Sequence, residues 1–117
     1  MSTNATITAG YIAPAVVALT DGATIAVDAA LGNDFRVTIA GSRTINDPTS
    51  AVDGQRITFQ ITQGSGGGFI VTWGSAFDFG AAGVPTLSTA AGKTDVLGFI
   101  YNAALSSWLC VGSALGF

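Results

Sequence analysis

The feature that most constrains the fold is an alternation of apolar and polar residues with a period of two. It is clearest at residues 55–63, QRITFQITQ, where Ile57, Phe59 and Ile61 alternate with Thr58 and Gln60. Successive side chains of an extended strand point to opposite faces, so the three apolar residues share one face. The pattern predicts a strand with one buried and one open face.

The same alternation recurs along most of the chain, between short turn signals such as Asp21-Gly22 and Asp53-Gly54. No segment has the 3.6-residue period of an amphipathic helix, and residues 75–93 are typical of a long loop with at most one short strand or turn of helix. The sequence therefore predicts an all-β protein, a small antiparallel β-sandwich or barrel of short strands. The other expected strands lie in residues 15–19, 23–29, 33–41, 43–47, 68–74, 95–102 and 107–112.

A glycine-rich run, Gly64-Ser65-Gly66-Gly67-Gly68, separates two of these strands. A phosphate-binding glycine turn is followed by a helix, whose N-terminus supplies aligned N–H donors. Here the β-branched and aromatic residues of FIVTW follow instead, and the lysine of a P-loop is missing. We therefore predict a loose hairpin between residues 55–63 and 69–73, because glycine tolerates positive φ angles.

Composition excludes several classes of partner. Only 9% of the 117 residues are charged, against about 25% in typical soluble domains, while 49% are hydrophobic. The net charge is −3 and the four basic residues are scattered, so no basic patch for nucleic acid is expected. The longest apolar stretch, residues 11–19, is too short to cross a membrane and contains Pro14. We also expect no signal peptide, because no positive segment precedes an apolar one.

The residue types needed for common catalytic sites are missing. The chain has no histidine and a single cysteine, Cys110, which excludes the common zinc spacings and leaves any serine without its usual base. The acidic residues are seven aspartates that mostly lie beside turns or at strand ends, where their side chains cap the backbone. We predict no enzymatic activity, no cofactor and no metal. Two alternatives stay open: a Ca²⁺ site built from converging aspartates, and a sugar-binding face formed by aromatic residues such as Trp73, Trp108, Tyr101 and Phe77.

Both ends of the chain are candidates for contact with a partner. Residues 1–14 are expected to form an extended N-terminal arm on a single β domain of residues 15–117, and such an arm can add a strand to the sheet edge of a neighbour. Phe117 is an unfavourable group to leave in water, which suggests burial against another subunit. The predicted interface residues are Tyr11, Ile12, Pro14 and Phe117.

Several motifs together resemble a known family. Asn46-Asp47-Pro48, the strand DGQRITFQITQ, the segment FIVTW and the closing strands TDVLGFIYN and WLCVG are similar to a small β-structured module of tailed-bacteriophage virion proteins. That module occurs in head decoration proteins, head fibres and the ends of tail fibres. The similarity covers about residues 22–112, and it implies a trimeric virion structural protein without catalytic residues.

Among the roles of that family, the sequence favours a capsid decoration, or cement, protein. The chain starts with Met, is one module long and has no repetitive shaft or coiled-coil heptads. A decoration trimer on the outer surface of the capsid would bridge subunits of the major capsid protein, with the N-terminal arm as the expected contact to the shell. Two alternatives remain: a tail-fibre or receptor-binding module that recognises host surface carbohydrate, and a non-viral binding module such as a small lectin.

Overall fold

The computed structural model describes residues 5–8 and 11–117, with side chains from residue 14 onward. Nearly all regular structure in these residues is β, apart from two three-residue 3-10 turns, η1 (Ala29–Leu31) and η2 (Gly80–Ala82). The strands are β1 (Ala5–Thr8), β2 (Tyr11–Pro14), β3 (Val16–Ala18), β4 (Thr24–Ile25), β5 (Asp34–Ile39), β6 (Arg43–Ile45), β7 (Arg56–Gln63), β8 (Val71–Trp73), β9 (Phe77–Asp78), β10 (Thr94–Asn102) and β11 (Ser107–Ala114).

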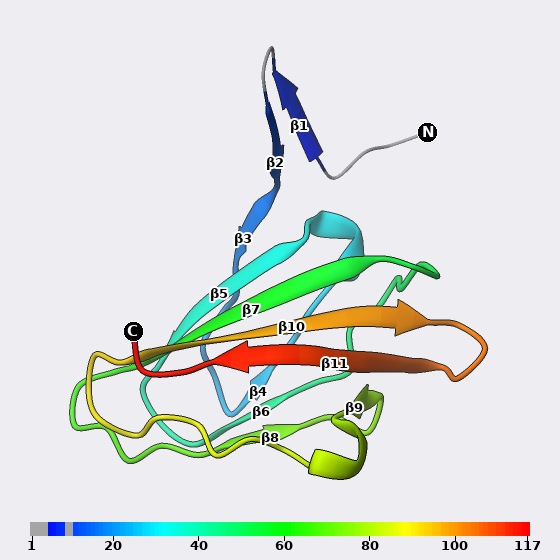
Figure 1. The fold of residues 1–117 in the computed structure, drawn as a ribbon. Helices are drawn as coiled ribbons and strands as arrows, with labels where there is room; N and C mark the ends of the chain where they lie inside the picture. The colour runs from blue at the N-terminus through cyan, green and yellow to red at the C-terminus, as the bar shows by residue number, and fades with distance from the viewer. Residues whose placement is uncertain (1–4, 9–10) are drawn as a thin grey trace.

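The strands form one large mixed sheet, one small parallel sheet and one hairpin (Figure 1). The large sheet has the order β3-β5-β7-β10-β11-β9, and the small sheet has the order β4-β6-β8. Strands β1 and β2 pair antiparallel with each other and lead away from the rest of the molecule. In the part of the chain that the structure describes, no helix is long enough to cross a membrane.

From β3 to β8 the chain winds as a three-turn coil. Each turn places one strand in the large sheet and the next strand in the small sheet, so β3, β5 and β7 run parallel, as do β4, β6 and β8. Parallel neighbours need a crossover connection, which is usually a helix. Here a strand of the opposite sheet serves as that crossover.

The prediction of an all-β protein is confirmed, but the prediction of an antiparallel architecture is wrong for the coil. Within the large sheet, antiparallel pairing occurs only where β10 joins β7 and where the turn at residues 103–106 folds β11 back on β10. The two-residue alternation defines which face of a strand is buried, and it contains no information about the direction of the neighbouring strand.

The prediction of a glycine hairpin is also wrong. Strand β8 pairs with β6 in the small sheet and not with β7, so residues 64–68 connect the two sheets. Gly66, Gly67 and Gly68 do have positive φ angles. At Gly67 a Cβ would collide with the backbone carbonyl of Thr89. Gly68 donates its N–H to the same carbonyl at 2.7 Å, so the run packs against the loop before β10.

The core lies between the two sheets and is rich in aromatic rings. Phe59, in the middle of β7, is fully buried, and its ring centroid lies 5.7–5.8 Å from those of four other aromatic residues. These four are Phe35, Trp73, Phe77 and Phe99. Contacts of this kind stabilise beyond the burial of their area. The predicted inward residues of β7, Ile57, Phe59 and Ile61, are all buried.

Candidate interaction surface

The aspartates have structural roles. Asp47 accepts a hydrogen bond from the backbone N–H of Ala76 at 2.8 Å, and Asp53 accepts one from Ala103 at 3.0 Å, so each fixes a segment distant in sequence. Asp28 is the N-cap of η1 and accepts from the N–H of Ala30, and Asp78 accepts from the N–H of Gly80 at the start of η2. Asp95, which is buried, accepts from the N–H groups of Ser88 and Gly116. These contacts agree with the predicted backbone-capping role of the aspartates.

Asp21 forms the most enclosed ion pair among the described residues. Both of its carboxylate oxygens accept from the guanidinium of Arg43, at 2.8 and 2.9 Å, and one also accepts from the N–H of Ala40. The hydrogen bond from Arg43 holds the pKa of Asp21 below its ordinary value of 3.8, against a smaller opposing effect of burial. The pair joins the turn after β3 to the start of β6.

We predict that this pair stabilises the fold in a pH-dependent way. A carboxyl group whose folded pKa lies below its unfolded value contributes stability above the unfolded pKa, and that contribution is lost as the pH falls through the folded pKa. Arg43→Gln should therefore lower the urea midpoint at about pH 7, and the difference from the parent should shrink towards about pH 2. Lys93→Gln, which removes a charge that makes no ion pair among the described residues, is the control. An equal loss from Arg43→Gln at both pH values would contradict the prediction.

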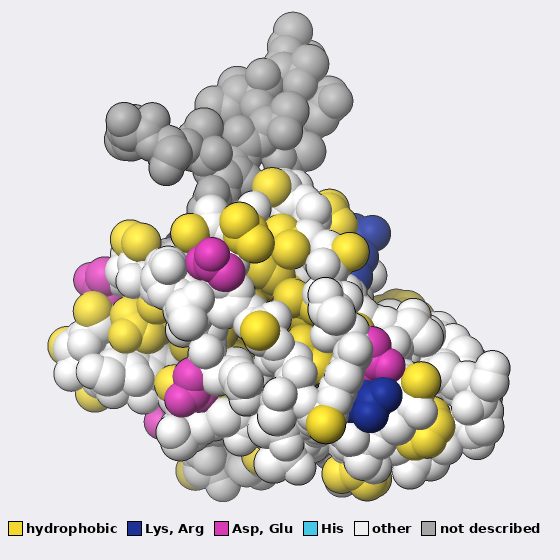
Figure 2. Space-filling model, turned by 180° about the vertical axis from the view of Figure 1, so that it is seen from behind, with side chains coloured by type: hydrophobic (Ala, Val, Ile, Leu, Met, Phe, Trp, Pro, Cys, Tyr) yellow, Lys and Arg dark blue, Asp and Glu magenta, His cyan; other side chains and the backbone are white. Residues whose placement is uncertain are grey.

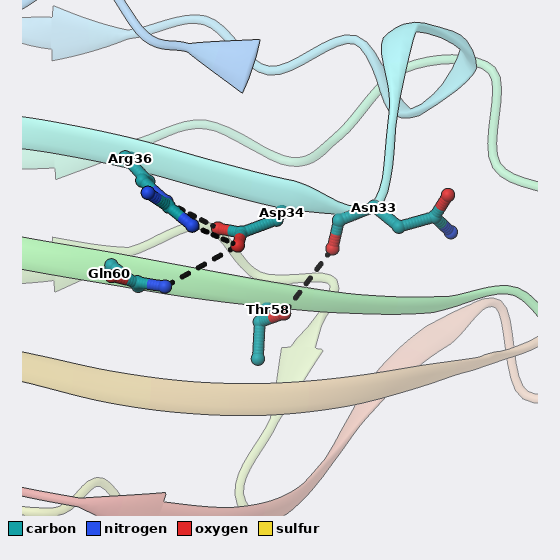
Figure 3. Close-up of polar contacts among 5 residues, drawn as sticks. All are labelled: Asn33, Asp34, Arg36, Thr58 and Gln60. Carbon is teal, nitrogen blue, oxygen red and sulfur yellow. Dashed lines mark hydrogen bonds and ion pairs between the residues drawn. The ribbon is translucent and has the colours of Figure 1, made fainter. Parts of the chain in front are cut away.

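A second polar network covers the open face of β5 and β7 (Figure 3). Asp34 accepts from the Nη2 and Nε atoms of Arg36, at 2.8 and 3.2 Å, and from Gln60 on the neighbouring strand at 3.4 Å. The hydroxyl of Thr58 donates to the carbonyl of Asn33 at 3.4 Å. The bond from Gln60 to Asp34 and the bond from Thr58 to Asn33 link adjacent strands, as cross-strand polar pairs do in sheets.

The two alternative sites from the sequence find little support in this geometry. Trp108 and Phe77 are 1% and 7% exposed, and Trp73 packs against Phe77 at 5.0 Å between ring centroids. Tyr101 is half-buried and packs on Trp108. These aromatic residues fill the core, the more common role of such side chains in strands. Among the residues that the structure describes, no three acidic or cysteine side chains gather as a metal site would require.

The surface instead exposes several large apolar side chains. From residue 14 onward, nine large apolar side chains are between 42% and 69% exposed. Seen from behind, charged side chains are few, and yellow apolar side chains lie among uncharged white surface (Figure 2). The nine are Val16, Leu31, Val52, Ile70, Val84, Leu105, Val111, Leu115 and Phe117.

Val111 stands at one side of a hollow on the open face of the large sheet. The hollow lies over Gly98, and its other lining residues include Pro14, Thr58 and Ile100. A β-bulge between Gly98 and Phe99 shifts the pairing of β10 with β11 at this point. Because Gly98 has no side chain, the sheet face is left depressed beside the exposed Val111.

The predicted interface residues fall in two separate places. Pro14 is exposed and ends β2, whereas the side chains of Tyr11 and Ile12 lie outside the described residues. Phe117 is 69% exposed, and its backbone N–H and carbonyl both pair with Thr94. Phe117 therefore lies beside the start of β10. In the large sheet β10 is three strands away from β3, the strand that follows Pro14. Sequence reasoning missed the exposure of Val111, because alternation alone does not show the β-bulge that places this side chain over Gly98 on the open face.

Comparison of the chain with protein-family models, with curated proteins and with solved structures found no match. The bacteriophage family remains a prediction from the residues quoted above.

Proposed function

We propose that this chain is a structural protein of a tailed-bacteriophage virion, a decoration protein that sits on the outer surface of the capsid as a trimer. The observation that carries the proposal is the apolar surface: nine large apolar side chains stand exposed on a β domain of which only 9% of the residues are charged. Where exposed apolar side chains gather into a continuous patch, the patch is typical of a face that binds another protein.

The mechanism of such a protein is mechanical. Each trimer contacts neighbouring subunits of the major capsid protein, and the buried apolar area holds those subunits together against the pressure of the packaged DNA. Burial of apolar surface contributes at most about 25 cal/mol per Å², so one contact is modest. Repeated over the many sites of a shell, the contacts raise the stability of the particle substantially.

The amount of this chain in purified particles tests the proposal. We expect it in quantities comparable to the major capsid protein of the phage that encodes it, measured by quantitative mass spectrometry of purified particles. Antibody labelling of intact particles should mark the heads. A few copies per particle, with label on the tail tips, would overturn the decoration role and favour the receptor-binding alternative.

A further inference from the structure

One edge of the large sheet is open over part of its length. Strand β9 pairs only with Trp108 and Leu109 of β11, so among the described residues Cys110 to Ala114 have no strand on that side. Natural sheet edges are usually protected by charged residues or proline against pairing with other chains. Residues 96–117 contain neither of these, although a β-bulge, which also protects edges, interrupts the pairing of β10 with β11 next to Val111. Val111 itself is 62% exposed.

The N-terminal hairpin is a strand pair without a sheet. Among the described residues, β1 and β2 pair only with each other, over four residue pairs. An isolated two-stranded hairpin is at best marginally stable in water. Residues 1–20 contain no charged side chain, so no charge would oppose placing the hairpin beside another strand.

The hairpin is not paired with the open edge of its own chain among the described residues. A single residue, Ala15, separates β2 from β3, and the hairpin leads outward from that point (Figure 1). Strand β11 is four strands away from β3, or about 19 Å at the usual strand spacing. A four-residue strand is only about 13 Å long. In the structure the hairpin accordingly leaves the open edge of β11 in its own chain unpaired, although Pro14 at the end of β2 lines the same hollow as Val111.

We propose that copies of this chain join head to tail, the β1–β2 hairpin of one copy adding to the open edge of β11 in the next. Main-chain hydrogen bonds would supply the pairing, as in other strand additions. A donor on one side and an acceptor on the other make a heterologous contact, which closes into a ring when the rotation between copies permits. The inference rests on the proposed function, because it explains how the copies of the proposed trimer are joined. It concerns contacts between copies alone, so it can be tested without a shell.

Two variants separate donor from acceptor. Deletion of residues 1–14 removes the hairpin, and Val111→Lys places a charge on the acceptor edge. Each purified variant should sediment as a monomer under conditions in which the parent forms an oligomer. Leu105→Lys is the matched control, because Leu105 is 60% exposed on the same β10–β11 hairpin but outside the open edge. It should assemble like the parent, and circular dichroism should confirm that each variant is folded. If Val111→Lys does not fold, Ser113→Lys on the same exposed edge replaces it.

Mixing the two variants gives the decisive result. The deletion variant keeps a working acceptor and Val111→Lys keeps a working donor, so an equimolar mixture should form one-to-one pairs that grow no further. A parent that is monomeric, or a deletion variant that still assembles as the parent does, would overturn the inference. If the deletion variant still assembles as the parent does but is lost from particles, the N-terminal arm contacts the shell instead of another copy. The decoration role would then still hold.

Discussion

Phe59→Ala should lower the free energy of unfolding by about 3–5 kcal/mol, the cost of removing a buried aromatic ring and leaving a cavity. Phe59 is fully buried in the central strand β7, which pairs with β5 on one side and β10 on the other. Its ring contacts residues from both sheets, including Phe35 and Trp73. Its loss therefore loosens both the coil and the antiparallel part of the fold.

Urea denaturation followed by tryptophan fluorescence measures this effect. Leu105→Ala provides the control, because that side chain is 60% exposed and its truncation should change stability by no more than about 0.5 kcal/mol. A loss from Phe59→Ala of less than about 1 kcal/mol would show that the core is not packed around this ring.

Asp95→Ala should have the second largest effect, a loss of about 1–3 kcal/mol. The carboxylate is 2% exposed and accepts from the backbone N–H of Ser88 at 2.6 Å and of Gly116 at 2.8 Å. Alanine would leave the N–H of half-buried Ser88 and that of exposed Gly116 without this partner. Only the more enclosed donor should cost the full penalty of about 1–3 kcal/mol. Asp95 thus fixes both the loop before β10 and the segment after β11.

The asparagine variant tests the hydrogen-bond explanation. In Asp95→Asn only one side-chain atom is an acceptor, so at least one of the two bonds is lost and the variant should also be destabilised. Asp78→Ala is the matched control, since that exposed carboxylate accepts a single bond, from Gly80 two residues away. If Asp95→Ala unfolds at the same urea concentration as Asp78→Ala, Asp95 does not have the proposed role.

The faces of individual strands could be predicted from the sequence, because alternation depends only on local geometry. Phe35, Val37 and Ile39 in β5 are buried, as the alternation within residues 33–41 indicates. The last two predicted strands, 95–102 and 107–112, agree closely with β10 and β11. Residues 75–93 contain one two-residue strand and one 3-10 turn, close to the predicted loop.

The arrangement of the strands depends on contacts between residues far apart in sequence, and local patterns do not contain it. The amide of Gln63 pairs with both the N–H and the carbonyl of Phe69, which turns the chain out of β7 towards the small sheet. Nothing in the glycine run itself distinguishes that course from a hairpin. The sequence likewise does not show that β11 has an open edge at Val111. The edge is open because β9 pairs with only two residues of β11.

The central claim is that this apolar, weakly charged β domain exists as an assembly of several copies. Sedimentation equilibrium of the unmodified, purified chain tests it most directly. We expect the mass of a closed oligomer, three copies if the ring is the proposed trimer. A single chain of 11.7 kDa that stays monomeric up to about millimolar concentration, where even weak association is seen, would contradict the account.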